Sequence, residues 1–165
     1  MKRKRFRNGG LRLCFSLVFC AGCTASFLLA VNGCCGIRPP AGATTVVRTL
    51  ETTGYCDCGA CCDWHRDWLF RPVYSSGPMK GKRKRVGVTA SGTQARKGTI
   101  AADTRLYPFG TVMYIDGYGY GRGEDRGDAI RGNHIDLFFS THDRALAWGR
   151  QAKRVLIWFE TRVGP

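Results

Sequence analysis

The second half of the sequence is a series of short apolar segments separated by glycine-rich turns. Residues 98–104 (GTIAADT), 134–139 (HIDLFF) and 153–160 (KRVLIWFE) have the length and residue content typical of single β-strands. Only residues 140–151 (STHDRALAWGRQ) have clear helical character, with Ser140 or Thr141 as the N-cap. Many short strands, tight turns and one short helix predict a mainly β protein.

Other segments extend this pattern toward the N-terminus. Residues 44–56 (TTVVRTLETTGYC) alternate and are rich in Thr and Val, and residues 85–92 (RVGVTASG) also predict a short strand. A turn near Pro108 and a glycine-rich turn after Tyr114 predict two further strands, the second of which returns to Asp125. We favour a closed barrel over a sandwich because no segment has the character of an exposed edge strand.

The N-terminus combines six basic residues with a long apolar run, Leu13–Val31. This arrangement predicts a secretory signal or an N-terminal membrane anchor. The sequence VNGCCG that follows resembles the lipobox of bacterial lipoproteins, which assigns lipidation to Cys34. Ordinary signal cleavage and an uncleaved anchor remain alternatives, and in each case we expect the rest of the chain to be exported.

We therefore divide the chain into three parts. Residues 1–34 are a signal peptide, lipoprotein leader or membrane anchor, and residues 35–44 are a linker. Residues 45–162 are the barrel domain, with a Cys-rich insertion at residues 56–85. We expect an exported, membrane-anchored protein that faces the periplasm or cell wall.

The chain carries a formal charge of +14, and the leader holds six of its basic residues and no acidic residue. The remaining chain is still strongly basic and is expected to attract polyanions. For an exported protein these are cell-wall polymers and lipid head groups, so no nucleic-acid partner is expected. The densest basic cluster, Lys80–Arg85, is explained either by a solvated loop or by a contact with an anionic glycan.

Four of the nine cysteines lie close together, at Cys56, Cys58, Cys61 and Cys62. In an exported domain such a group first suggests disulfides, although a bond between neighbouring Cys61 and Cys62 would be strained. The same thiols, with His65 nearby, also suit a tetrahedral Zn²⁺ or an iron–sulfur cluster. Disulfides, a metal site and free thiols all remain open. Zinc at this cluster is a candidate cofactor, and the protein is otherwise expected to require none.

Two aspartates stand out by their surroundings. Asp136 lies within the apolar segment HIDLFF, and Asp125 ends a predicted strand eleven positions earlier. The pKa of a free aspartate is about 3.9, and burial or a neighbouring carboxylate raises it. A carboxyl group in such a setting is suited to hold a proton at neutral pH. Taken singly, an aspartate at a strand end is equally well explained as a turn cap.

The motifs TASGT, GTIAADT, YPFGT, EDRG, IDLFF and the helix-to-strand ending occur in an order that resembles the 3D domain, which is named for three aspartates. The sequence also resembles the C-terminal part of membrane-bound lytic transglycosylase A and, more distantly, rare lipoprotein A and expansins. The resemblance implies a six-stranded double-psi β-barrel. It places the three aspartates at Asp103, Asp125 and Asp136, and it implies peptidoglycan as the substrate.

The implied reaction is cleavage of a glycan strand that leaves a 1,6-anhydromuramyl end. A lytic transglycosylase needs one carboxyl group, which first protonates the glycosidic oxygen and then accepts the proton of the sugar's own 6-hydroxyl. We assign this role to Asp136. Asp125 is expected to raise its pKa and hold substrate or water, and Asp103 to anchor the network.

Three further residues are candidates for substrate binding. His134 precedes Asp136 by two positions, so both share one face of a strand. It either orients the sugar or the acid, or is a half-exposed strand histidine. Tyr118 and Tyr120 flank a glycine turn and offer aromatic faces that stack on sugars.

Three functional hypotheses follow. The first is an exported lytic transglycosylase that acts on peptidoglycan glycan strands, as a monomer held at the membrane by its lipid or N-terminal anchor. The second is a module that binds peptidoglycan without cleaving it. The third is a metal-linked or redox-linked protein that uses the cysteine cluster.

Overall fold

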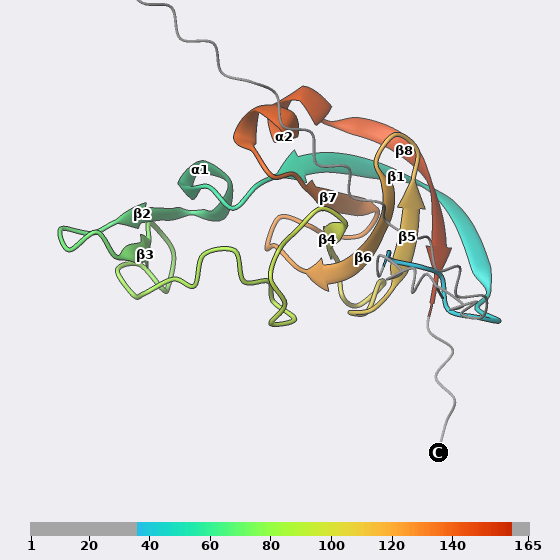
Figure 1. Cartoon of the computed structure of the whole chain (residues 1–165), viewed down its shortest axis with the longest axis horizontal. Helices are drawn as coiled ribbons and strands as arrows, with labels where there is room; N and C mark the ends of the chain where they lie inside the picture. The colour runs from blue at the N-terminus through green and yellow to red at the C-terminus, as the bar shows by residue number, and fades with distance from the viewer. Residues whose placement is uncertain (1–35, 160–165) are drawn as a thin grey trace, which may run out of the picture. The chain divides into compact units, whose positions relative to one another are not determined.

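The computed structural model describes residues 36–159, which form eight strands and two short helices (Figure 1). The leader, including Cys34, lies outside the described residues. In chain order the elements are β1 Thr45–Tyr55, α1 Gly59–Cys62, β2 Trp64–Arg66, β3 Pro72–Tyr74, β4 Thr99–Ala102, β5 Val112–Ile115, β6 Gly119–Asp125, β7 His134–Phe138, α2 His142–Trp148 and β8 Gln151–Trp158.

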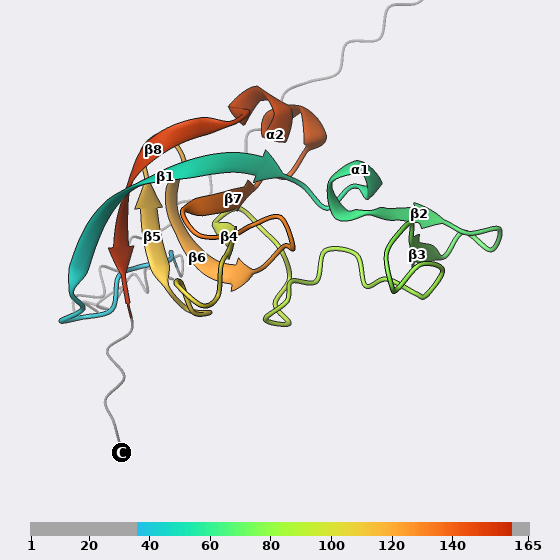
Figure 2. The ribbon, with the colours of Figure 1, turned by 180° about the vertical axis from the view of Figure 1, so that it is seen from behind.

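Six of these strands close into a barrel in the order β1-β7-β4-β6-β5-β8, with β8 returning to β1. The pairs β1–β7 and β4–β6 are parallel, and the other four are antiparallel. Figure 2 shows the long strands β1 and β8 curving together around the barrel. The closed six-stranded barrel confirms the predicted fold class, and closure leaves these strands no free edge.

Alternate side chains along each strand fill the barrel interior. In β7, Ile135 and Leu137 are fully buried, whereas His134 and Asp136 are only half-buried because they point to the outer face. The interior is mostly aliphatic: Leu50, Ile100, Met113, Ile115, Ile135, Leu137, Val155 and Ile157. The outward positions are therefore free to carry polar side chains for a surface site.

Helix α2 packs against β1 at Thr52 and Gly54, positions that share the face of Leu50 in the barrel core. Thr141 caps it, since its Oγ1 accepts a hydrogen bond from the Arg144 N–H (3.4 Å). The backbones approach closely at Gly54, where a Cβ atom would lie 2.8 Å from the carbonyl oxygen of Ala145. The Trp148 indole donates a hydrogen bond to Thr52 Oγ1 (3.1 Å) and fixes the other end of the helix on the barrel.

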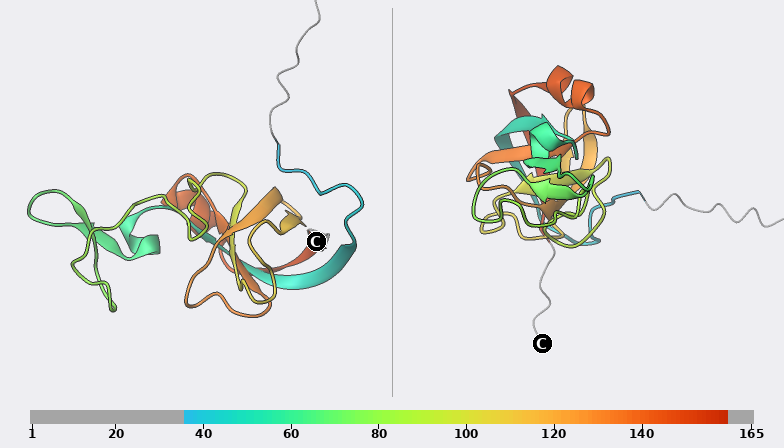
Figure 3. Two further views of the ribbon diagram at one scale, coloured as in Figure 1. Left: turned by 90° about the horizontal axis from the view of Figure 1, so that it is seen from below. Right: turned by 90° about the vertical axis from the view of Figure 1, so that its left-hand side faces the viewer.

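The insertion after β1 contains α1 and a separate two-stranded sheet, β2–β3, which lies outside the ring of six strands (Figure 3). Neither element was predicted from the sequence. The strand predicted at residues 85–92 was wrong: this segment is a loop with one isolated bridge, Val88 to Gln94. Gly87 and Gly92 have φ angles of 72° and 89°, a left-handed conformation that does not continue a strand.

Among residues 36–159, no helix has the length and apolar character needed to cross a bilayer.

Replacement of a barrel-core residue tests the predicted inside and outside of the strands. We expect Ile135→Ala to lower the free energy of unfolding by about 2–5 kcal/mol, because it removes a fully buried side chain from a packed interior. Val47 of β1 is 51% exposed, so Val47→Ala is the matched control and should change stability by about 0.5 kcal/mol or less. Chemical denaturation measures both, and equal losses would contradict the assigned faces.

Candidate functional site

A groove of about 660 Å³ runs along the outer face of the barrel, between the strands and the insertion. The end of β1, the insertion, β6, β7 and the loop after β6 all contribute to its lining. It contains two of the three predicted aspartates. Its lining includes Tyr55, Asp57, Cys61, Cys62, Tyr74, Lys84, Arg85, Ala90, Ala101, Asp125, Arg126, Asp136 and Phe138.

Asp136, Ala101 and Asp125 form one row across three neighbouring strands. Ala101 of β4 pairs with Asp136 of β7 on one side and with Asp125 of β6 on the other. Directly paired residues share a face, and strands are about 4.8 Å apart, so the Cα atoms of the two acids are about 10 Å apart. Ala101, between the two aspartates, contributes to the groove lining but is itself buried and packs with Tyr55 and Phe138.

A β-bulge puts Asp125 on this face. The pairing of β4 with β6 shifts by one residue just before Ala101, which leaves Glu124 as the extra residue. In an unshifted register Glu124 would pair with Ala101, and Asp125 would pair with Ala102, whose side chain is buried in the barrel. The bulge therefore turns Asp125 toward the groove. Glu124 is itself buried and accepts a hydrogen bond from Thr99 Oγ1 (2.8 Å).

Asp136 is the acid whose surroundings favour a bound proton. Burial raises its pKa above the usual range, and the charge of Asp125 adds to the rise. Three neighbours act in the opposite direction: the Thr53 hydroxyl, which donates to Asp136 Oδ1 (2.8 Å), His134, and the backbone of Leu137. The net effect is a raised pKa, as the sequence setting predicts.

A hydrogen-bonded chain leads from His134 to Asp136. Thr53 Oγ1 lies 2.9 Å from His134 Nε2. A hydroxyl has one hydrogen, and Thr53 gives it to Asp136, so Nε2 of His134 is the donor in this contact. Nδ1 of His134 lies 3.9 Å from Glu51 Oε1, on the side away from Thr53. His134 is therefore connected to the Asp136 carboxyl group through the Thr53 hydroxyl.

Asp125 accepts three hydrogen bonds. Its Oδ1 receives the backbone N–H groups of Ala90 and Arg126 (2.9 Å each), and its Oδ2 receives the Tyr55 hydroxyl (3.1 Å). Burial, followed by the charge of Asp125, raises the pKa of Tyr55, so the phenol remains a donor. Both oxygens of Asp125 thus act as acceptors, as those of an ionised carboxylate do.

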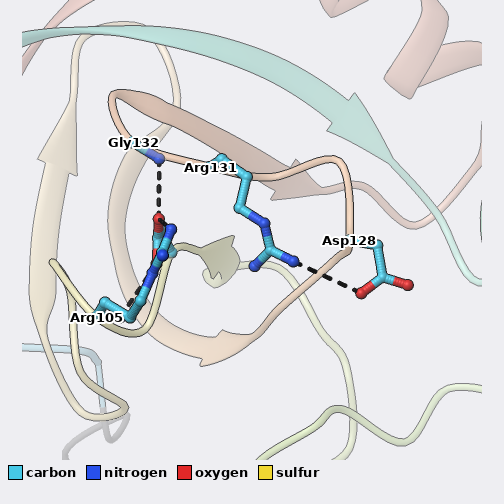
Figure 4. Close-up of polar contacts among 5 residues, drawn as sticks. Arg105, Asp128, Arg131 and Gly132 are labelled. Atoms are coloured by element: carbon cyan, nitrogen blue, oxygen red, sulfur yellow. Dashed lines mark hydrogen bonds and ion pairs between the residues drawn. The ribbon is translucent and has the colours of Figure 1, made fainter.

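Asp103 does not line the groove. It is buried after β4, where Arg105 donates to it through Nε (3.0 Å) and Nη2 (2.8 Å), and the Gly132 N–H donates as well (3.0 Å). Arg105 and then Gly132 hold the pKa of Asp103 far below its usual range. Figure 4 shows Gly132 and Arg105 in these contacts, and the ion pair of Arg131 with Asp128 (3.8 Å) in the same loop.

The position of Gly132 gives Asp103 an indirect connection to the site. Gly132 belongs to the loop that joins Asp125 at the end of β6 to β7, which carries Asp136. Asp103 therefore fastens the segment between the two groove acids rather than touching either of them within the described residues. The predicted role of Asp103 as the anchor of a carboxyl network stays a prediction, and its observed partners are Arg105 and Gly132.

The two tyrosines predicted to bind sugar do not line the groove. Tyr118 is buried in the barrel core, where its hydroxyl donates to the Phe138 carbonyl (2.9 Å) and accepts from the Gly98 N–H (2.9 Å). Tyr120 is exposed but packs against Tyr114 and Trp158 on the side of β5 and β8. The aromatic residues in the groove lining are Tyr55, Tyr74 and Phe138, which the sequence analysis did not single out.

The cysteines divide into two groups. Cys56, Cys58 and Cys61 converge on His142, and all four ligand atoms lie within 4.8 Å of one another. Cys62 is turned away and its Sγ donates to the Cys56 carbonyl (3.2 Å). All four thiols are free. His65, the histidine nearest in sequence, contacts Ser75 Oγ instead (2.9 Å).

Some site residues gave only a weak signal in the sequence. Thr53 and Tyr55 belong to a strand that was predicted, and their period-two spacing places them on one face. What the sequence lacks is the parallel pairing of β1 with β7, which sets Thr53 beside Asp136 and Tyr55 beside Phe138. His142 likewise approaches the cysteines only because the start of α2 lies close to α1, which the sequence does not show.

The fold and the site together define a class: a closed six-stranded barrel that carries two carboxyl groups of contrasting surroundings in an outer groove. Residues 98–159 match the model of the 3D domain, and this segment contains Asp103, Asp125 and Asp136. This match confirms the resemblance to the 3D domain that the motifs of the segment predict.

Two curated relatives come from Bacillus subtilis strain 168. A protein named for cell wall shaping, YabE, is 36% identical over 75 residues, which are 43% of this chain and 18% of that protein. A cell wall-binding protein, YocH, is 40% identical over 67 residues, which are 38% of this chain and 23% of that protein. The match thus spans less than a quarter of either relative.

Solved structures of the lytic transglycosylase MltA from E. coli also resemble the fold. The crystal structure of MltA reported to reveal a unique lytic transglycosylase fold has a TM-score of 0.39 at 20% identity, over 50% of this chain and 30% of that chain. A structure of MltA with bound chitohexaose has a TM-score of 0.38 at 20% identity, over 55% of this chain and 30% of that chain.

The buried position of Asp103 generates a test of its role. Asp103→Asn should lower the melting temperature at neutral pH and speed hydrogen exchange in the loop around Gly132, because the paired carboxylate is lost. A depressed pKa contributes stability above the usual aspartate pKa of about 3.9, and that stability is lost as pH falls further. The difference between variant and wild type should therefore shrink in acid.

Asp116→Asn is the control for this measurement, since Asp116 lies in an exposed turn. It should leave both the melting temperature and the exchange of the loop unchanged. Equal melting temperatures of Asp103→Asn and wild type at neutral pH would contradict an anchoring role for Asp103.

Proposed function

We propose that this protein acts on the cell wall as a lytic transglycosylase, with Asp136 as general acid and base on a peptidoglycan glycan strand. The observation that carries the proposal is the half-buried Asp136, with its raised pKa, in a groove of about 660 Å³ that also contains Asp125. The match to the 3D domain and the names of the two cell-wall relatives support the choice of substrate.

The proposed reaction begins with protonated Asp136. Its proton goes to the glycosidic oxygen as the bond from that oxygen to the anomeric carbon breaks. Asp136, now a carboxylate, accepts the proton of the 6-hydroxyl of the same sugar. The freed oxygen bonds to the anomeric carbon and closes a 1,6-anhydro ring. One bond is broken and one is formed, the carboxyl group is restored and no water is consumed.

The neighbours of Asp136 suit both halves of this cycle. Burial and the charge of Asp125 favour the acid form that starts the reaction. The hydrogen bond from Thr53, supported by His134, stabilises the carboxylate that forms after proton transfer. Without the hydrogen bond from Thr53, burial and the charge of Asp125 would make the Asp136 carboxylate too unstable to form readily. A group that serves as both acid and base requires both kinds of influence.

Replacement of Asp136 tests the proposal directly. Purified protein incubated with murein sacculi should release anhydromuropeptides, and digestion in ¹⁸O-labelled water should leave the new ends unlabelled. Asp136→Asn should reduce this activity by about 10²–10⁴-fold, the usual contribution of a general acid or base. Asp116→Asn should retain full activity. Mass spectrometry of the digests measures all of these, and cleavage by Asp136→Asn at the wild-type rate would refute the assignment.

The pH dependence follows from the same group. Activity requires the protonated form, so the rate should fall as pH rises through the raised pKa of Asp136, by about tenfold per pH unit at the upper end. The stability of the fold should also decrease as pH rises through this pKa, because a buried acid with a raised pKa destabilises the fold once it ionises. Asp136→Asn should therefore melt at or above the wild-type temperature at neutral pH. A lower melting temperature would indicate a structural role for the carboxylate.

A second candidate function is wall binding without cleavage. Lys84, Arg85 and Arg126 lie in the groove lining and favour an anionic polymer. Binding of this kind predicts that sedimentation with sacculi weakens as salt increases and is the same for wild type and Asp136→Asn. Sacculi that remain intact after such binding would assign the groove to this function instead.

A further inference from the structure

The strongest unassigned feature is the cluster of Cys56, Cys58, Cys61 and His142. His142 Nδ1 lies 3.4 Å from Cys61 Sγ, 3.5 Å from Cys58 Sγ and 3.9 Å from Cys56 Sγ. Cys56 Sγ and Cys61 Sγ are 3.7 Å apart. These four potential ligand atoms come from three places in the fold: the end of β1, helix α1 and the start of α2. All four converge on one point.

These separations match a tetrahedral metal site. With Zn–S bonds of about 2.3 Å and Zn–N bonds of about 2.05 Å, ideal tetrahedral angles put sulfur atoms about 3.8 Å apart and sulfur about 3.6 Å from nitrogen. The measured S–S distance of 3.7 Å and the S–N distances of 3.4–3.9 Å agree with these values. A disulfide requires about 2.05 Å between sulfur atoms, which is far shorter than the measured separation.

We propose that Cys56, Cys58, Cys61 and His142 bind one Zn²⁺ ion. Three thiolates and one imidazole are a ligand set typical of structural zinc sites, in which four protein ligands leave no position for substrate. The site is therefore a structural one, and it does not take part in the proposed reaction at Asp136. It stands independently of whether the groove cleaves or only binds glycan.

The local backbone explains which thiols take part. Cys58 is the N-cap of α1, and Cys61 lies three residues later, so both side chains lie on the same side of a single helical turn. Cys62 comes one position later and points elsewhere, toward the Cys56 carbonyl. The sequence alone does not distinguish the four cysteines. The geometry of the helical turn directs Cys58 and Cys61 toward the cluster and Cys62 away from it.

A bound metal would add to the contacts that hold α1. This helix has four residues and no side-chain hydrogen bond at its N-cap, and Cys61 and Cys62 pack against the cluster of Tyr55, Ala101 and Phe138. The ion would tie it to the first residue of α2, which is itself fixed on β1 through Trp148 and Thr52. Asp57, Cys61 and Cys62 line the groove, so the site fixes one wall of the groove relative to the barrel.

Metal content of matched variants tests the proposal. The full-length chain, purified under reducing conditions and dialysed with ZnCl₂, should retain about one zinc per chain by elemental mass spectrometry. Cys61→Ser and His142→Ala should each weaken zinc retention against a chelator by at least about tenfold. Cys62→Ser and His65→Ala are the controls, since these residues are adjacent in sequence but outside the cluster, and both should retain zinc as wild type does.

Two further measurements test the zinc site even if one of these variants folds poorly. Co²⁺-substituted wild type should show the thiolate-to-cobalt charge-transfer absorption and the visible bands of a tetrahedral site. His142→Cys should restore zinc binding that His142→Ala loses, because it supplies a fourth thiolate.

Four outcomes would overturn the site. They are zinc below about one tenth of an equivalent per chain, equal zinc loss in Cys62→Ser and Cys61→Ser, full zinc retention in His142→Ala, and disulfides in place of free thiols in protein purified from an oxidising compartment. Asp136→Asn should bind zinc like wild type. Failure of the metal site is thereby distinguished from failure of the proposed transglycosylase.

Discussion

The one-residue shift in the pairing of β4 with β6 is the constraint on which the groove depends. Because of this bulge, Asp125 shares a face with Ala101 and Asp136 instead of pointing into the barrel. Ala101 lies between the two acids and packs with Tyr55 and Phe138, which also line the groove. Closure of the barrel fixes all three strands, so the spacing of the acids is set by backbone pairing rather than by flexible side chains.

The three aspartates have different physical roles although they share one family pattern. Burial keeps the pKa of Asp136 high, whereas Arg105 keeps that of Asp103 low. Asp125 accepts hydrogen bonds from three donors, which fix its orientation. A single acid with a raised pKa, next to a charged neighbour, is what a reaction that uses one group as both acid and base requires.

Much of the fold was accessible from the sequence because alternation and glycine turns are local signals. They located the six barrel strands β1, β4, β5, β6, β7 and β8 and helix α2, and the apolar setting of Asp136 correctly indicated a raised pKa. The remaining features depend on pairing between distant segments. The bulge at Asp125 and the approach of His142 to the cysteines have no local signature, and the buried position of Tyr118 follows from a hydrogen bond to Phe138 across the barrel.

The most direct test of the account is the titration of Asp136 itself, followed by the ¹³C NMR signal of its side-chain carboxyl group. The account predicts a midpoint above the usual aspartate value of about 3.9, and a lower midpoint in Asp125→Asn, where the neighbouring charge is removed. A midpoint at or below the usual value in the wild-type protein would contradict it, because Asp136 would then have no proton to donate near neutral pH.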